Sequence, residues 1–490
     1  MAGARTPTRL PCRRAACSRL LTAAILVGLL CPGASWAQTT LSTDAASTTG
    51  EPTAAPQQGT SGTEAGSPGG GSQDAAQQQT KPDDVLSSVS FSVQEQSEVW
   101  ARLFGGGHQN FSYNGLTTGS LAVDLDKLLD WKKAQFFVSA FDIHGHGPSR
   151  SLAGNNQLIS NIEATPSIKL YDLWLEQRLF GTLYLRVGQE GANDEMMISR
   201  YASLFINSSF GFPGNLAANL PSGGPNYPMA TPFVRARWKT TENLALVGAV
   251  FNGDPAPPGS GDPQIRDRNG TAFRTDGNSL SFAELRYKTD PDEPDSLSTV
   301  YRLGGWYHSG RFADQRFDIN GGLLASPSSS GIARQHRGDF AFYGIVDQVL
   351  WRREDAKAEG VGVFLQVQAG PSDRSLSNVF VEGGVNWNAP FHERPNDVAG
   401  LAFAYLGISP AAQQFSQDLV AFGRATSTYA SNETIIEATY KAPITDNLTL
   451  QPDAQFVVNP NAHIPGQFGP KLLSNTLVVG VRVTVSLGNQ

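Results

Sequence analysis

The chain lacks several features that mark soluble or helical membrane proteins. All three cysteines, Cys12, Cys17 and Cys31, lie near the N-terminus, so disulfides cannot stabilise the body of the chain. No stretch after residue 40 approaches the about 18 consecutive apolar residues of a membrane-spanning helix, which excludes a helical membrane protein. A transmembrane β-barrel escapes this hydropathy test, because its strands alternate apolar and polar side chains.

Motifs of enzymes and nucleic-acid-binding proteins are also missing. No Gly-x-Ser-x-Gly elbow or phosphate-binding loop is present. The seven histidines are scattered, and the one close pair, His144 and His146, has no third ligand at metal-site spacing. We therefore expect no catalytic residue, no metal and no cofactor.

The N-terminus predicts export. Five arginines precede the apolar run Leu20–Leu30, and Ser35-Trp36-Ala37 places small residues at the positions that signal peptidase reads. We predict a signal peptide over residues 1–37. Its removal takes five of the 37 basic residues and no acidic one, which leaves 32 against 44 and a net charge of −12. This balance argues against a nucleic-acid partner, which needs a basic surface.

Residues 38–84 are rich in Thr, Ser, Ala, Gln, Gly and Pro and predict a disordered linker. The body, residues 85–490, repeats a period-two pattern that is typical of strands with one apolar and one polar face. The clearest case is Asn475–Leu487, where Val478 is the one exception to the alternation. The same pattern occurs in residues 183–188, 234–239, 283–288 and 363–368.

Two kinds of connection join these strands. Thr240–Asn243 and Thr445–Asn447 are brief, whereas Gly253–Asn278 and Asp318–Gly338 are long and polar. Short turns at one end and long loops at the other are typical of outer-membrane barrels. The length of the body predicts an all-β transmembrane antiparallel barrel of about 16 strands, which leaves an aqueous channel. Aromatic residues near strand ends suit the two membrane interfaces: Tyr287, Trp306, Tyr307, Trp351 and Tyr440.

One stretch departs from the alternation. Asn193–Leu220 has no clean period, and we predict a loop that folds inward and narrows the channel, with a short helix opening at Asp194–Ile198.

Several segments carry a more specific signal. One block runs from Ser160–Ala164 through Leu170–Gln177 to Leu185–Gln189. Before this block lies Leu125–Trp131, which we expect to form a strand and a turn. After the block come Ala202–Gly211, Leu220–Pro225, Gly305–Gly310, Gly344–Gln348 and Arg394–Gly400. Together these segments resemble the carbohydrate-selective porin family, the glucose-porin type of outer-membrane channel. The chain departs from the family at Glu98–Leu103, which replaces a Gly-Asp-Trp-Gly-Gly-Arg-type stretch.

The resemblance implies a 16-stranded barrel in the outer membrane of a Gram-negative bacterium and passive diffusion of small sugars such as glucose. The expected partners are small sugars and outer-membrane lipid, with a homotrimer as one arrangement by analogy. An outer-membrane barrel enzyme of the lipid-hydrolase type and a soluble extracellular carbohydrate-binding β-sandwich are the alternatives.

A sugar channel needs hydrogen-bonding groups for hydroxyls and an aromatic surface for C–H faces. Arginine offers a fixed fan of donors, and a carboxylate accepts from two hydroxyls. The same side chains can instead pair with one another and only hold the wall in place. The channel-lining candidates are Asp172, Trp174, Glu176, Arg178, Arg186, Glu190, Asp194, Glu195, Arg235 and Arg237, with Lys239, Glu284, Arg286 and Lys288 on the same polar parity.

Overall fold

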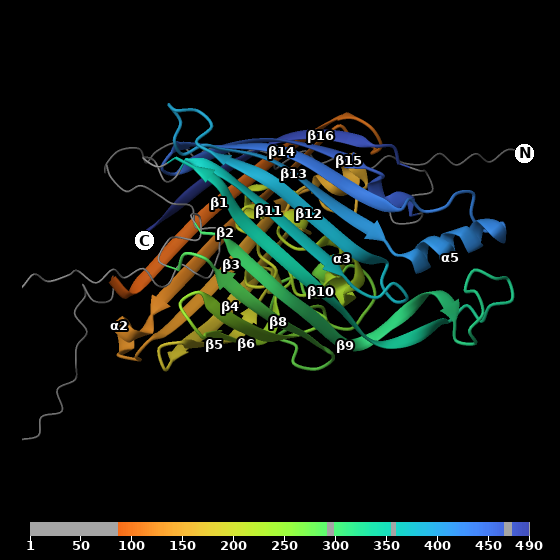
Figure 1. The fold of residues 1–490 in the computed structure, drawn as a ribbon, viewed down its shortest axis with the longest axis horizontal. Coiled ribbons are helices and arrows are strands. Elements are labelled where there is room, and N and C mark those ends of the chain that lie inside the picture. Colours follow the sequence, from red (N-terminus) through yellow and green to blue (C-terminus); the bar gives the residue numbers. More distant parts are fainter. Residues whose placement is uncertain (1–86, 292–297, 354–358, 465–472, 490) are drawn as a thin grey trace, which may run out of the picture. The chain divides into compact units, whose positions relative to one another are not determined.

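The computed structural model describes residues 87–291, 298–353, 359–464 and 473–489, so the predicted signal peptide and linker lie outside the described residues. The strands of the described part form one closed antiparallel barrel, in which each strand pairs with its sequence neighbours and β1 pairs with β16 (Figure 1). The strands are β1 (Val89–Phe104), β2 (Phe111–Asp124), β3 (Ala134–Gly145), β4 (Ser167–Leu179), β5 (Leu183–Glu190), β6 (Thr231–Lys239), β7 (Leu244–Asn252), β8 (Ser279–Lys288), β9 (Val300–Asp318), β10 (Ala333–Arg352), β11 (Gly360–Ala369), β12 (Ser377–Asn388), β13 (Val398–Ile408), β14 (Asn432–Thr445), β15 (Leu448–Val458) and β16 (Thr476–Asn489).

The predicted alternation sets the two faces of the wall. On β16, Val481 and Leu487 are 42% and 57% exposed on the outside, whereas Arg482 between them is buried inside. Apolar side chains on the outer face suit lipid, and the polar set turns inward. The all-β transmembrane barrel is therefore confirmed. The β-sandwich alternative is wrong, because the sheet closes on itself.

The connections differ in length between the two ends of the barrel. One end has turns as short as residues 180–182, 240–243 and 446–447, and the other carries long loops such as 146–166, 191–230 and 253–278. Two expectations need correction. Leu125–Trp131 is not strand but contains α2 (Leu125–Leu129), which Asp124 caps by accepting hydrogen bonds from the backbone N–H of Asp126 and Lys127. The loop expected at Asp318–Gly338 is shorter, because β10 already begins at Ala333.

The helical segments are all short. Among the described residues, none is long and apolar enough to cross a membrane. The α-helices other than α2 are α3 (Gly214–Asn219), α4 (Pro263–Arg266) and α5 (Pro410–Ala421), and the single turns are η1 (Ser149–Ala153), η2 (Ala192–Asp194), η3 (Ala202–Leu204), η4 (Ser208–Phe210), η5 (Pro221–Gly223) and η7 (Pro460–His463).

The predicted aromatic positions mostly face outward. Tyr287, Tyr307 and Trp351 are exposed on the outer wall, where interfacial aromatics belong. Trp306 is an exception to the prediction. It is buried on the inner face and its indole Nε1 donates to Gln368. Adjacent residues on a strand point to opposite faces, so Trp306 and Tyr307 could not both face lipid.

An apolar core lies inside the barrel. Residues 191–230, called the inward loop, and residues 146–166, called the second inward loop, pack their apolar side chains against apolar residues on the inner wall. Phe205 and Ile206 of the inward loop join Phe364 of β11 and Val478 of β16 in this inner core. Val478 breaks the alternation of its strand because it faces these loops and not water.

Candidate functional site

The inward loop crosses the inside of the barrel from β5 and is anchored to the opposite wall. The backbone N–H groups of Ile206 and Asn207 donate to the carboxylate of Glu437 on β14, at 2.5 and 3.0 Å. The Gln451 side chain of β15 donates to the Leu204 carbonyl at 2.8 Å. The loop returns past β11, where Gln368 donates to Asn215 of α3 at 2.8 Å (Figure 1). The predicted inward course of this loop is thereby confirmed.

The short helix expected at Asp194–Ile198 is wrong. The chain forms only the single turn η2 (Ala192–Asp194) before continuing as turns and bends. Instead of adding a helical turn, Glu195 extends its side chain towards the wall, and the backbone N–H of Met197 donates to Glu284 of β8. Contacts between the loop and the wall thus replace the local hydrogen bonds of a helix.

Glu195 lies at the centre of a group of charged side chains between the inward loop and the wall. Its Oε2 is 2.7 Å from Arg235 Nη2 on β6, and its Oε1 is 3.0 Å from Arg286 Nη1 on β8. Burial alone would raise the pKa of Glu195, but the guanidinium groups of Arg235, Arg286 and Arg186 hold this pKa well below its usual range. Glu195 is therefore an anion that fixes the loop to two strands.

The same group extends along β4 and β5. Glu176 Oε2 is 2.9 Å from Arg186 Nη2 and 2.8 Å from Arg235 Nη2, and Glu190 Oε2 is 2.9 Å from Arg186 Nη1. On the other side, Glu284 Oε1 is 3.4 Å from Arg302 Nη1 of β9. We call these eight side chains the charged cluster: Glu176, Arg186, Glu190, Glu195, Arg235, Glu284, Arg286 and Arg302.

Exposure separates the members of the charged cluster. The side chains of Arg186 and Arg235 are only 2% and 1% exposed, because the inward loop covers them. Those of Arg286 and Arg302 are 13% and 10% exposed and therefore reach the aqueous side. Two donors of Arg235, Nε and Nη1, have no hydrogen-bond partner among the described residues. The cluster thus has a buried anchoring part and an edge that can donate to a solute.

Asp194 and Asp172 form a separate acidic group beside the cluster. Burial and the nearby carboxylates of Asp172 and Glu190 raise the pKa of Asp194 well above its usual range. Asp172 lies on β4 and accepts a hydrogen bond from Ser139 Oγ at 2.6 Å. It faces inward next to the equally buried Tyr171 because the register with β3 shifts at this point.

The structure brings most of the predicted candidates together, but not all. The Trp174 ring is covered by the Arg186 guanidinium, 3.8 Å from its centroid, and lies against Phe137 at 5.1 Å. Arg237 stacks on Tyr184 at 4.5 Å. Arg178 is exposed at the short-turn end, where its Nε donates to the Gly181 carbonyl at 2.8 Å.

Two side chains at the site went unnoticed in the sequence. Arg302 stands between the outward-facing Tyr301 and Leu303, so its inward parity was detectable. Tyr343 donates its hydroxyl to Glu284 at 2.8 Å and stands at an inward position of β10. Its strand parity was visible, but its partner comes from a strand that is not adjacent and could not be read from the sequence.

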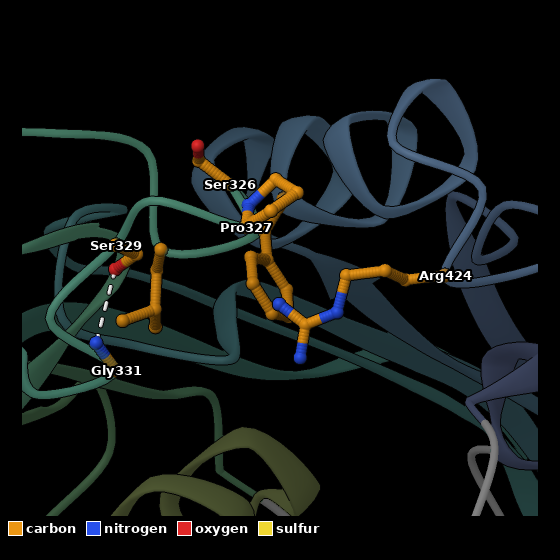
Figure 2. Close-up of a pocket in the computed structure, with 7 residues that line it drawn as sticks. Ser326, Pro327, Ser329, Gly331 and Arg424 are labelled. Carbon is orange, nitrogen blue, oxygen red and sulfur yellow. Dashed lines mark hydrogen bonds between the residues drawn. The ribbon is translucent and has the colours of Figure 1, made fainter.

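A separate hollow lies at the long-loop end. An open cavity of about 400 Å³ lies between residues 324–331 and α5, and Arg424 extends across it towards the loop (Figure 2). Arg424 Nη1 donates to the Ala325 carbonyl at 3.1 Å. The cavity lining has no carboxylate beside this arginine, so it lacks the paired donors and acceptors of the charged cluster.

Among the described residues, no three His, Cys, Asp or Glu side chains come close enough to hold a metal ion. The charged cluster combines guanidinium donors and carboxylate acceptors at the edge of an inward loop, within a barrel large enough for water. Such an arrangement can exchange hydrogen bonds with a hydroxylated solute without binding it tightly.

Comparisons with known proteins agree with this reading. The family model described as carbohydrate-selective porin, OprB family, matches residues 108–487. Porin B of Pseudomonas aeruginosa is 23% identical over 416 residues, covering 80% of this chain and 86% of that protein. The high-pH structure of Pseudomonas putida OprB has a TM-score of 0.72 at 19% identity and covers 83% of this chain and 96% of that chain. Its low-pH structure has a TM-score of 0.50 at 14% identity, with 83% and 95% covered. The chain therefore belongs to the carbohydrate-selective porin, OprB family, and its place is the outer membrane of a Gram-negative bacterium.

Proposed function

We propose that small sugars, monosaccharides such as glucose among them, diffuse passively through this barrel past the exposed edge of the charged cluster. The observation that carries the proposal is the fixed position of Arg286 and Arg302 at that edge. Their donors are aimed by Glu195 and Glu284, so a passing sugar meets oriented hydrogen-bonding groups. Because each guanidinium is already paired with a carboxylate, a sugar is held weakly and leaves again.

The buried arginines have a second part in this proposal. Arg186 and Arg235 hold the inward loop against the wall and so set the width of the passage. Arg237 adds its positive charge close to Glu195. Trp174 supports Arg186 and does not offer its covered face to a sugar. The barrel carries out no chemical step in this proposal and needs no cofactor, so it works as a channel and not as an enzyme.

Liposome swelling across a panel of sugars tests this proposal. Wild-type protein should admit monosaccharides faster than disaccharides. Replacement of Arg235 and Arg237 by Ala should reduce that difference several-fold, and Arg302→Ala should slow monosaccharides alone. Arg178→Ala is the matched control, because this arginine lies on the same wall but away from the cluster. Unchanged sugar preference after substitution of Arg235, Arg237 and Arg302 would contradict the assignment.

Two further parts of the proposal concern the assembled protein. We propose that residues 1–37 are removed on export, so that N-terminal sequencing of the protein from outer membranes should begin at Gln38. We also propose that the barrel self-associates as a homotrimer in the membrane, which native mass spectrometry would detect as a threefold mass.

A further inference from the structure

The open cavity at the long-loop end lies clear of the membrane. One of its walls, residues 324–331, belongs to the connection between β9 and β10, which have 19 and 20 residues (Figure 1). A strand crosses the membrane with about 9–11 residues, so the far end of this hairpin stands beyond the lipid. The other wall is α5 with Arg424 behind it. Long loops face outward in outer-membrane barrels, so the cavity opens to the external medium.

A single carboxylate, that of Asp318 at the end of β9, fixes the first wall. Asp318 Oδ1 accepts hydrogen bonds from the backbone N–H groups of Asn320 and Gly322, at 3.0 and 2.9 Å. Asp318 Oδ2 accepts from Ser329 Oγ and from the backbone N–H of Ser330, at 2.8 and 2.9 Å. Both ends of the loop are therefore held to the same side chain.

The second wall is joined to the first at two places. The ion pair of Arg316 and Asp418 holds α5 against β9, at 2.7 and 3.1 Å. Beyond α5, the backbone N–H of Arg424 donates to the Leu419 carbonyl at 2.8 Å, and Arg424 Nη1 reaches the carbonyl of the fully buried Ala325 at 3.1 Å. These contacts fix the width of the cavity before any ligand arrives, which lowers the entropic cost of binding.

Arg424 gives the cavity a positive charge (Figure 2). A guanidinium carries five N–H donors, and the Ala325 carbonyl accepts only one of them. The acidic residues of the two walls are engaged elsewhere, Asp318 by the loop and Asp418 by Arg316. The remaining donors of Arg424 can form paired hydrogen bonds with a phosphate or carboxylate group, which a guanidinium matches in shape.

The rest of the lining suits a sugar ring. Phe415 and Leu324 provide apolar surface for the C–H faces of a sugar, and Ser326 and Ser329 place hydroxyl groups beside it. A hydroxyl both donates and accepts, as the hydroxyls of a sugar require. The volume of about 400 Å³ lies within the range of small-molecule sites.

We propose that this cavity binds a sugar ring that carries a negatively charged group, a phosphate ester above all. The anionic group pairs with Arg424, the ring lies against Phe415, and Ser326 exchanges hydrogen bonds with the sugar hydroxyls. Such a sugar comes from one of two sources: the phosphorylated core of lipopolysaccharide in the outer leaflet, or a free sugar phosphate. The site lies outside the charged cluster and does not depend on the proposed passage of neutral sugars.

Calorimetry of the full-length protein in detergent tests the site with glucose 6-phosphate as the probe. A hydrogen-bonded charge pair predicts that glucose 6-phosphate binds about tenfold more tightly than glucose and that Arg424→Gln removes this difference. Arg311→Gln is the matched control, because Arg311 is exposed on the outer face of β9 and outside the cavity lining, and its binding should be unchanged. Equal binding by Arg424→Gln and wild type, or no binding by wild type, overturns the proposal.

A second control separates the cavity from the passage. The charged cluster also contains arginines, so Arg302→Ala shows whether the probe binds there instead. Binding by Arg302→Ala should equal that of the wild type, and a loss as large as that in Arg424→Gln overturns the proposal. Liposome swelling in glucose should be the same for Arg424→Gln and wild type, so failure of this site leaves the proposed sugar diffusion intact.

Phe415→Ala separates the sugar ring from its anionic group. This variant should bind glucose 6-phosphate several-fold more weakly and inorganic phosphate as the wild type does, because phosphate has no ring to lie against Phe415. Heat-modifiable migration in gels verifies that each variant folds. Equal losses for the two probes contradict a sugar ring in the cavity.

The core oligosaccharide released from lipopolysaccharide identifies the source of the sugar. If the oligosaccharide binds more tightly than glucose 6-phosphate, the natural ligand is the lipopolysaccharide that surrounds the barrel. If it binds more weakly, the ligand is a free solute. Absence of binding by both probes overturns the proposal.

Discussion

Glu195 lies 2.7 Å from Arg235, although 40 positions separate them in the sequence and one belongs to the inward loop while the other belongs to the barrel wall. The pair is almost fully buried, and Arg286 contacts the same carboxylate from another strand. Removing one partner of a buried ion pair costs about 3–5 kcal/mol, because the remaining charge is left unpaired. The position of the inward loop therefore depends strongly on this one carboxylate.

Glu195→Gln should loosen the inward loop and raise single-channel conductance, with faster swelling in disaccharides. Asp194→Asn is the matched control, because Asp194 precedes Glu195 in the same loop and its carboxylate accepts a hydrogen bond from the side chain of Asn193 and not from an arginine. The conductance of Asp194→Asn should therefore stay close to that of the wild type. Similar conductance changes in the two variants would contradict the anchoring role of Glu195.

Acid should reproduce the loosening in the wild type. The pKa of Glu195 is lowered on folding, so its contribution is complete above its ordinary pKa and is lost as pH falls below that value. Conductance measured in planar bilayers should rise when the pH is lowered from 5 to about 3, and Glu195→Gln should lack this rise. A flat wild-type profile would argue against the ionised carboxylate as the anchor.

Glu163 of the second inward loop should give the opposite pH dependence. Burial raises its pKa to about 7, although Ser149 donates to the carboxylate through its backbone N–H and hydroxyl. The protonated form is favoured by folding, so this contribution to stability is present below the ordinary pKa and is lost as pH rises through about 7. Thermal unfolding in detergent should show a lower Tm at pH 8 than at pH 5, and Glu163→Gln should reduce the difference.

The outer face of β16 allows a direct test of the membrane-facing parity. Val481→Arg should destabilise the folded barrel in vesicles by about 2–4 kcal/mol, because the charge faces lipid. Thr484→Arg on the same strand turns towards the lumen and should cost much less. Urea titration in phospholipid vesicles measures both free energies, and equal losses would contradict the assigned faces.

At the long-loop end, Arg316 and Asp418 form a two-point ion pair that ties α5 to β9, at 2.7 and 3.1 Å. The pair is partly exposed, so Arg316→Ala should cost only about 0.2–1 kcal/mol. Its effect should be local: α5 and the adjoining residues 422–431 should become more sensitive to external protease, while heat-modifiable migration of the barrel stays unchanged. Unchanged proteolysis would show that the pair does not hold α5 in place.

The wall of the barrel could be predicted from the sequence, because the residues that define the two faces of a strand are neighbours in the chain. Each strand shows its two faces in successive residues, so the outward row of β16 and the inward parity of Arg235 and Glu284 follow from alternation alone. The inward loop was detectable as a loss of that alternation. Trp306 was assigned to the wrong face because a tendency of aromatic residues was given more weight than strand parity.

The arrangement inside the barrel could not be predicted in the same way. The partners of Glu195 come from three strands, and the sequence does not indicate which arginines meet it. Val478 and Phe364 are apolar residues at strand positions where the alternation predicts a polar side chain. The sequence pattern does not explain them, because the apolar surface that covers them belongs to loops elsewhere in the chain. Arg178 and Glu176 point to the same side of β4, but Arg178 lies closer to the end of the strand and therefore outside the charged cluster.

The inner core includes Trp100 from β1 and Val478 from β16, the first and last strands of the barrel. Pairing of these two strands closes the ring, so that core is incomplete while the seam between them is open. A barrel whose seam is still open therefore leaves the inward loops without part of their support. A newly made barrel should therefore acquire its narrow passage late in assembly, when the seam closes.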